Sequence, residues 1–290
     1  MDGECQLHND IKNRSERTGE ELVLGQVDFI NCLPINLPIE SGEVKINANI
    51  VNGVPSKLNK LILNNEIDIA PVSSLTYLEN KEKLIPIADL CIASNGPADS
   101  VLLFSKFPLE ELNGAKIALS HASTTSNKLL EIILNEFLNL KCRFELPVDE
   151  TVNRRVDESA KLLIGDDALR EYAKGPRDKF IYDLGSLWKK HTGLPMIFGI
   201  WVARKEIAVR AGLDLPLITQ QLIQSKEIGL NEMFDVVLKK AMDSIPLSRD
   251  FYRGYFEHLS YNFTDDFKQG LDLFERHCKK INFVGAAYKT

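Results

Sequence analysis

Residues 44–78, VKINANIVNGVPSKLNKLILNNEIDIAPVSSLTYL, carry the pattern that decides the fold. Polar and apolar side chains alternate over residues 44–51, as in a half-buried strand. After the turn NGVPS, apolar residues recur at helical spacing. A second strand, IDIAPV at 67–72, leads into Ser73 and Ser74, whose hydroxyls can cap the next helix. This order predicts an α/β protein with helices packed on a parallel or mixed sheet.

The same alternation extends outward to about residue 203. The apolar stripe over residues 126–138 predicts the clearest helix. Beyond residue 204 the strand signal stops, and four helices are expected instead, at 217–227, 233–242, 248–259 and 264–280. Further strands are expected at residues 22–30, 84–92, 101–104, 116–119, 142–146, 161–164, 180–182 and 197–203.

The chain length of 290 residues suits about two domains, yet no low-complexity linker divides it. We therefore expect two lobes joined by strands that cross between them near residues 103 and 203. One lobe would hold residues 22–103 together with 204–290, and the other would hold residues 104–203. A cleft between such lobes is a favoured ligand site. Residues 1–21 are polar and are expected to form a flexible extension.

Composition and charge argue against several classes of protein. Lys and Arg total 35 against 41 Asp and Glu, so the net charge is −6, which argues against nucleic acid as a partner. The longest uncharged apolar stretch, residues 193–203, is shorter than the ~20 residues of a membrane-spanning helix. The five cysteines form no CxxC pair, and residues 1–21 have no apolar leader segment. We expect a cytoplasmic protein that acts on a small molecule.

Several well-known catalytic motifs are missing. The sequence contains neither GxGxxG nor GxxxxGK[ST], so no nucleotide fingerprint is present. HExxH and GxSxG are also missing, and the five histidines are scattered. Hydride transfer, metal-dependent hydrolysis and acyl transfer therefore have no support from motifs.

Polar clusters instead follow the predicted strands. Asn31 ends the strand before FINCLP, Ser73 and Ser74 follow IDIAPV, and Ser100 precedes a crossing strand. Each also has an ordinary structural explanation. An Asn can close a turn, a Ser can cap a helix, and a Ser can bond its own backbone.

The segment SHASTTS at residues 120–126 leads from a strand into the strongest helix. Ser123, Thr124 and Thr125 supply more hydroxyls than one helix cap needs, and the helix N-terminus attracts anions. The cluster is therefore a candidate carboxylate or phosphate site. Asp166 and Asp183 also stand at strand ends, where capping of the following helix accounts for them.

Five collinear segments resemble one enzyme family. They are VDFINCLPI (27–35), GVPSKLNKLILNNEIDIAPVSSLTYL (53–78), SVLLFSKFPLEELNGAKIALSHASTTS (100–126), LLIGDDAL (162–169) and YDLGSLWKKHTGLPMIFGIW (182–201). Together they resemble the chorismate dehydratases of the futalosine route to menaquinone. The resemblance implies a periplasmic-binding-protein type 2 fold, in which two α/β lobes joined by a hinge flank a ligand cleft. It also implies a cytoplasmic carbon–oxygen lyase.

The implied reaction eliminates water from chorismate and gives 3-[(1-carboxyvinyl)oxy]benzoate, with no metal or organic cofactor. The family's N-x-L-P and S-V-x-L motifs match at Asn31 and Ser100, which are the implied catalytic residues. Cys32 stands where relatives often carry Thr. The expected substrate-binding residues are Ser73, Ser74, Ser123, Thr124, Thr125 and Asp166.

Three alternatives stay open at this point. The first is 1,4-dihydroxy-6-naphthoate synthase of the same pathway, although its Ser/Pro/Cys-rich opening does not match FINCLPI. The second is a non-catalytic solute-binding protein for a small carboxylate. The third is the ligand-sensing domain of a regulator, for which no basic helix-turn-helix segment precedes the fold. The sequence leaves the oligomeric state and the proton acceptor undetermined.

Overall fold

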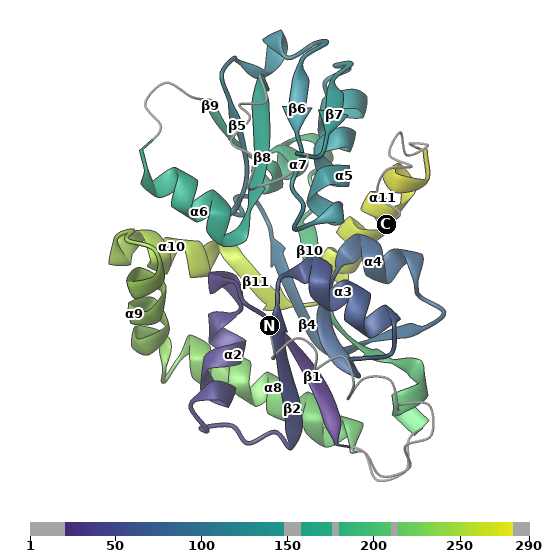
Figure 1. Cartoon of the computed structure of the whole chain (residues 1–290), viewed down its shortest axis with the longest axis vertical. Coiled ribbons are helices and arrows are strands. Elements are labelled where there is room, and N and C mark those ends of the chain that lie inside the picture. The colour runs from purple at the N-terminus through teal and green to yellow at the C-terminus, as the bar shows by residue number, and fades with distance from the viewer. Residues whose placement is uncertain (1–20, 148–157, 176–179, 210–213, 281–290) are drawn as a thin grey trace, which may run out of the picture.

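A computed structural model describes residues 21–147, 158–175, 180–209 and 214–280. The extension predicted at residues 1–21 lies outside these ranges apart from Glu21. Two β-sheets stand one above the other along the long axis of the molecule, with helices around each (Figure 1). The expected α/β architecture with mixed sheets is confirmed.

The lower sheet in Figure 1 has six strands in the order β11-β4-β10-β3-β1-β2. Strand β1 pairs in parallel with β2 and β3, and β10 lies antiparallel between β3 and β4. The strands are β1 (Leu22–Val27), β2 (Ala48–Gly53), β3 (Ile69–Ser73), β4 (Leu84–Ser94), β10 (Met196–Arg204) and β11 (Leu259–Asn262).

The upper sheet has five strands in the order β7-β6-β8-β5-β9. Its β7, β6 and β8 are parallel, and β5 is antiparallel to its neighbours β8 and β9. The chain passes between the sheets at residues 95–100 and again at 193–195, a few residues before each predicted crossing. The division into lobes at 103/104 and 203/204 stays a prediction. The strands are β5 (Val101–Ser105), β6 (Lys116–Ala118), β7 (Arg143–Glu145), β8 (Ala160–Ile164) and β9 (Phe180–Asp183).

Helices cover both sheets, and the helix predicted over 126–138 is continuous but changes to π-helical pitch after its first eight residues. Among the described residues, no helix has the length and apolar character to cross a membrane. The helices are η2 (Ile30–Cys32), α2 (Leu33–Glu40), α3 (Pro55–Leu63), α4 (Ser74–Glu79), η3 (Leu109–Glu111), α5 (Thr124–Glu131), η4 (Ile132–Phe137), α6 (Gly165–Ala173), α7 (Leu184–Thr192), η5 (Lys205–Val209), α8 (Leu215–Leu230), α9 (Phe234–Ser244), α10 (Arg249–His258) and α11 (Asp265–Lys280).

Three expectations about strands were wrong. The strand expected over residues 44–51 begins only at Ala48 and continues to Gly53. The strand signal does not stop at residue 204, because β11 (Leu259–Asn262) pairs with β4 at the edge of the lower sheet. Its four residues are too few to show an alternation that stands out from the flanking helices. The strand predicted over 22–30 ends at Val27, because Pro34 near the start of α2 favours a helical entry there.

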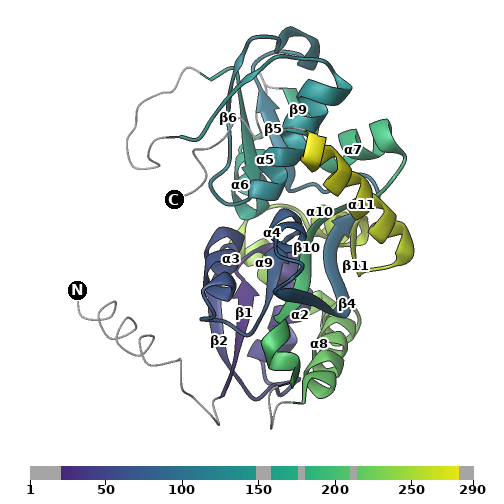
Figure 2. The same cartoon turned by 90° about the vertical axis from the view of Figure 1, so that its right-hand side faces the viewer.

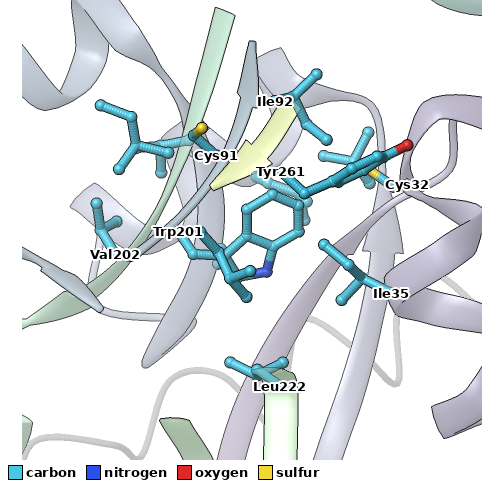
Figure 3. Packing of buried hydrophobic residues seen from close by; sticks show 14 of the residues in the cluster. Cys32, Ile35, Cys91, Ile92, Trp201, Val202, Leu222 and Tyr261 are labelled. Atoms are coloured by element: carbon cyan, nitrogen blue, oxygen red, sulfur yellow. The ribbon is translucent and has the colours of Figure 1, made fainter. Parts of the chain in front are cut away.

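The four C-terminal helices lie close to their predicted positions, and the last of them serves both sheets. Phe267 and Leu271 of α11 join the core of the lower sheet, which surrounds Trp201 (Figure 3). Phe274, two turns from Phe267, packs edge-on against Trp188 in the core of the upper sheet. Figure 2 shows α11 running along the side of the molecule past both sheets. Helix α11 therefore connects the two halves by packing into both cores.

The first crossing between the sheets packs tightly against α7. A Cβ atom added to Gly185 would lie 2.4 Å from the carbonyl oxygen of Gly96 and 2.6 Å from Ser94 Oγ. Neither distance is one that real Cβ atoms tolerate. Only a glycine at the start of α7 lets the crossing segment approach this closely.

We predict that Gly185→Ala lowers the free energy of unfolding by about 1–3 kcal/mol, because the crossing segment must move to admit the methyl group. Gly254→Ala in α10 is the matched control, since nothing lies within 4 Å of the added atom. Alanine there should raise stability by about 0.5–1 kcal/mol through helix propensity. Urea denaturation of both variants measures the difference, and equal stabilities would contradict the proposed close packing.

Candidate active site

A cleft lies between the two sheets. Part of its wall comes from the C-terminal ends of β1, β3 and β8 and from the helix starts that follow them, which is where open α/β sheets bind ligands. The starts of β5, β10 and β11 supply further lining residues. Both halves of the molecule contribute. The lining residues are Val27, Phe29, Asn31, Cys32, Pro55, Pro71, Val72, Ser73, Ile92, Ala98, Ser100, Val101, Ser123, Ser126, Ile164, Gly165, Phe198, Gly199 and Leu259.

Asn31 lies on η2, in the short connection between β1 and α2, and its side chain lines the cleft. Its carbonyl oxygen accepts a hydrogen bond of 2.8 Å from the Tyr261 hydroxyl, which fixes the backbone. The side-chain Oδ1 is buried and has no hydrogen-bond partner among the residues that the structure describes. A buried polar atom without a partner is costly, so this amide is suited to bind a polar group of a ligand.

Ser100 ends the first crossing between the sheets and also lines the cleft, with only 3% of its surface exposed. Its Oγ accepts a hydrogen bond of 3.0 Å from the Tyr255 hydroxyl. The same Oγ donates to the carbonyl oxygen of Ala98 at 3.3 Å, which is long for a bond between a hydroxyl and an oxygen. Asn31 and Ser100 thus meet at one cleft from opposite halves of the molecule.

Asp183 holds the segment in front of Ser100. Its carboxylate accepts hydrogen bonds from the backbone N–H groups of Ala98 and Asp99, the second at 2.7 Å, and also caps α7 through the N–H of Ser186. Burial raises the pKa of Asp183, although these three N–H groups oppose the increase. The structural role expected for this residue, capping a helix, is confirmed.

The two serines after β3 have different surroundings. Ser73 lines the cleft, and its Oγ accepts a hydrogen bond of 3.0 Å from Asn59 and shares another of 2.9 Å with Thr76. Ser74 is fully buried, and its Oγ donates to the carbonyl oxygen of Ile197 at 2.7 Å, so it fastens α4 to β10. Ser74 is absent from the cleft lining.

The hydroxyls at the start of α5 are also divided between cleft and scaffold. Ser123 caps the helix by accepting from the N–H of Ser126 at 3.1 Å, and both residues line the cleft. Thr125 is fully buried, and its Oγ1 accepts from the backbone N–H of Leu75 at 2.8 Å. This bond joins α5 of the upper half to α4 of the lower half. Thr124 is half-buried and does not line the cleft.

A second contact between the halves involves Asp166, which stands outside the cleft lining. Its Oδ1 accepts a hydrogen bond of 2.9 Å from the backbone N–H of Ile30, next to Asn31, and burial raises its pKa. Beside it, Gly165 has a φ of +54°, and a Cβ there would lie 2.7 Å from the ring of Phe29. Only glycine accommodates both conditions, so α6 packs directly on the segment that carries Asn31.

Sequence reasoning missed several residues of the site. Tyr255 and Tyr261 come from the C-terminal segment, where the sequence indicated covering helices and nothing more. Ser126 belongs to the hydroxyl cluster at residues 120–126, but the sequence pattern did not mark it as a binding residue. Cys32 lines the cleft, but burial raises the pKa of its thiol, which keeps it protonated. Within the described ranges, no three His, Cys, Asp or Glu side chains converge as a metal site would require.

We predict that Asp183→Ala lowers the free energy of unfolding by about 2–4 kcal/mol, because three backbone N–H groups lose their acceptor. Hydrogen exchange of the peptide covering residues 95–105 should also speed up. Asp214→Ala is the control, since Asp214 caps α8 at the surface through a single bond to Leu217. That variant should cost about 1 kcal/mol and leave exchange over residues 95–105 unchanged. Equal exchange in the two variants would show that Asp183 does not hold the crossing segment.

Comparison with solved structures bears on the fold. Protein AF1704 from Archaeoglobus fulgidus superposes with a TM-score of 0.69 and 17% identity, covering 89% of this chain and 97% of that one. The alkanesulfonate-binding protein SsuA from Xanthomonas axonopodis pv. citri, bound to MOPS, superposes with a TM-score of 0.62 and 14% identity, covering 88% of this chain and 92% of that one. The periplasmic sulphonate-binding protein SsuA of Escherichia coli is also similar, with a TM-score of 0.58. The expected periplasmic-binding-protein-like fold is confirmed.

Curated relatives bear on the family. A chorismate dehydratase of Thermus thermophilus is 29% identical over 235 residues, 76% of this chain and 81% of that protein. One of Campylobacter jejuni is 32% identical over 182 residues, 61% and 65% of the two chains. A 1,4-dihydroxy-6-naphthoate synthase of Thermus thermophilus is more distant, at 23% identity over about half of each chain. The family model described as "Menaquinone biosynthesis" matches residues 22–280, so this chain belongs to the menaquinone biosynthesis family.

Proposed function

We propose that this protein is a chorismate dehydratase, a carbon–oxygen lyase that eliminates water from chorismate to give 3-[(1-carboxyvinyl)oxy]benzoate. The observation that carries the proposal is the meeting of Asn31 and Ser100 at one cleft, with the Asn31 Oδ1 buried and unpaired. The likeness to two chorismate dehydratases supports the same activity. A cytoplasmic location is part of this proposal.

The proposed substrate is a dianion, while none of the described residues that line the cleft is charged. Hydroxyl and backbone N–H groups can hold a carboxylate without a cation, because hydrogen bonds to an ionised acceptor are strong. The N-terminus of α5, with Ser123 and Ser126, faces the cleft and favours negative charge. Ser73 faces it from the other half. We assign the substrate carboxylates to these groups.

In this proposal, the other residues that were predicted to bind the substrate help to maintain the shape of the cleft. Ser74, Thr125 and Asp166 each bond to a backbone group of another element. The bonds of Thr125 and Asp166 join the two halves beside the cleft. Thr124 occupies the first position of α5, where its backbone N–H belongs to the anion-binding end of the helix.

The elimination breaks the C3–H and C4–O bonds of the ring and forms a C3–C4 double bond, so that the ring becomes aromatic. Ser100 donates a hydrogen bond to the leaving C4 hydroxyl and Asn31 orients the substrate by hydrogen bonds. Neither residue is a general base, since a base needs a pKa near the operating pH. The enolpyruvyl carboxylate of the substrate takes the C3 proton and passes it to the oxygen that departs from C4, so that water is released and the carboxylate is ionised again. Positioning of this kind lowers a barrier by several kcal/mol.

The first test is incubation of the protein with chorismate, with the aromatic product followed by chromatography. We expect turnover by the unaltered chain and a fall in kcat/KM of at least ~100-fold in Asn31→Ala and in Ser100→Ala. Ser105→Ala is the control: Ser105 is also buried and ends β5, the strand that follows Ser100, and its Oγ donates to the carbonyl oxygen of Phe107 outside the cleft. Near-normal kcat/KM in both site variants, with folding intact, would overturn the assignment of these residues.

The same experiment separates the other functions. Binding of chorismate without turnover would favour a solute-binding protein or a sensor domain. Neither binding nor turnover would favour 1,4-dihydroxy-6-naphthoate synthase, whose distant similarity extends over about half of this chain. Either result would contradict the dehydratase.

A second prediction concerns the carboxylate site. Ser123→Ala removes the hydroxyl that faces the cleft and the cap of α5, so we expect KM to rise by roughly 10-fold and stability to fall by about 1 kcal/mol. Asp214→Ala removes a cap of similar strength from α8 and should leave KM unchanged. Steady-state kinetics and urea denaturation measure the two effects. If KM were the same in the two variants, Ser123 would not contact the substrate.

A further inference from the structure

The Tyr255 hydroxyl donates a hydrogen bond to Ser100. Tyr255 lies on α10, 155 residues away from Ser100 in the chain, and only 1% of its surface is exposed. Its ring packs among aromatic neighbours, with the centroid of Phe256 at 5.3 Å and that of Phe251 at 6.3 Å. The phenol is therefore held in one orientation, and its oxygen stands 3.0 Å from Ser100 Oγ.

The direction of this hydrogen bond determines what Ser100 can do. Tyr255 donates, so it occupies one lone pair of Ser100 Oγ and leaves the Ser100 proton free to be donated elsewhere. Within the described part of the chain, that proton is donated to the carbonyl oxygen of Ala98, at 3.3 Å and two residues back in the chain. A strong acceptor in the cleft would compete well for it. Hydrogen bonds in a chain polarise one another, so the bond from Tyr255 makes Ser100 a better donor.

Tyr255 is suited to donating a hydrogen bond and unsuited to transferring its proton. Burial raises its pKa well above the ordinary value for tyrosine, although the bond to Ser100 opposes the increase. The raised pKa favours the protonated phenol, which can donate to Ser100. In the observed arrangement Tyr255 donates to Ser100 Oγ, and the Ser100 hydroxyl donates away from α10, to the carbonyl oxygen of Ala98.

We propose that Tyr255 is a positioning residue that directs the Ser100 hydroxyl proton toward the leaving hydroxyl of the substrate. This role rests on the proposed dehydration. As the C4–O bond breaks, negative charge develops on the departing oxygen. The chain from Tyr255 through Ser100 to that oxygen stabilises the charge. The interaction is stronger in the transition state than in the bound substrate, so its loss affects kcat more than KM.

The test is Tyr255→Phe, which removes one oxygen atom and keeps the ring. We expect kcat to fall by about 10- to 50-fold with KM changed less than about 2-fold. Tyr252→Phe is the matched control, since Tyr252 lies on the same helix, is fully buried and donates to the carbonyl oxygen of Ile245 at 2.9 Å. Both variants lose a buried phenol bond, so both melting temperatures should fall by similar amounts. Only Tyr255→Phe should lower kcat.

A double-mutant cycle with Ser100→Ala tests whether Tyr255 acts through Ser100. If it does, Tyr255→Phe should cost less than about 2-fold in kcat once Ser100 is alanine. The inference is overturned if Tyr255→Phe matches Tyr252→Phe in kcat, if its effect falls on KM alone, or if the two substitutions multiply. An unaltered protein that does not turn over chorismate overturns the proposed function, and with it this role. That outcome is seen before any variant is made, so the two failures are distinguishable.

Discussion

One carboxylate fixes the segment that connects the two halves of this protein. Asp183 accepts backbone N–H groups from the crossing segment and from the first turn of α7 at once. The crossing segment carries Ser100, so the same bonds that connect the sheets also fix a residue of the cleft. The pKa of Asp183 is raised by burial, which means that the ionised form is disfavoured in the folded protein. The pH-dependent part of its contribution to stability is therefore greatest at acid pH and is lost as the pH rises through its folded pKa, while the hydrogen bonds from the three N–H groups remain. At neutral pH the role of the Asp183 carboxylate is to fix the geometry of the crossing segment.

The cleft combines an apolar wall with a small number of neutral polar groups, and this combination suits an anion that must also react. A cation in the cleft would bind the substrate and the product with similar strength, since both carry two carboxylates. Hydroxyls and a helix N-terminus bind carboxylates more moderately and leave the surroundings weakly polar, so the hydrogen bond to the leaving oxygen counts for more. The net charge of −6 fits this arrangement. Recognition of the dianion depends on local groups at the ends of strands and helices.

The sequence was sufficient for the α/β alternation, because strands and helices here have clear periodicity and capping residues. It also located the polar clusters correctly at the strand ends. It could not distinguish Ser73 from Ser74, or Ser123 from Thr125, because neighbouring hydroxyls differ only in the partner that the fold brings to each. Thr125 meets the N–H of Leu75 and Ser74 meets the carbonyl of Ile197, and neither pairing leaves a local pattern. The strand β11 was missed for a similar reason, since its pairing with β4 is a property of the assembled sheet.

The C-terminal segment illustrates how a fold shared with binding proteins can supply a more rigid site. Tyr255 and Tyr261 follow one another on α10 and β11, and they donate to the two residues that we assign to catalysis. In Figure 3 the Tyr261 side chain extends past Trp201 toward Cys32, beside the segment that carries Asn31. A few residues further on, α11 packs into the cores of both halves. A ligand can be bound by two lobes that merely close on it, whereas an elimination needs the donor and the orienting amide at fixed positions. Through their hydrogen bonds to Ser100 and Asn31, Tyr255 and Tyr261 hold both residues against one buried segment beside the cleft.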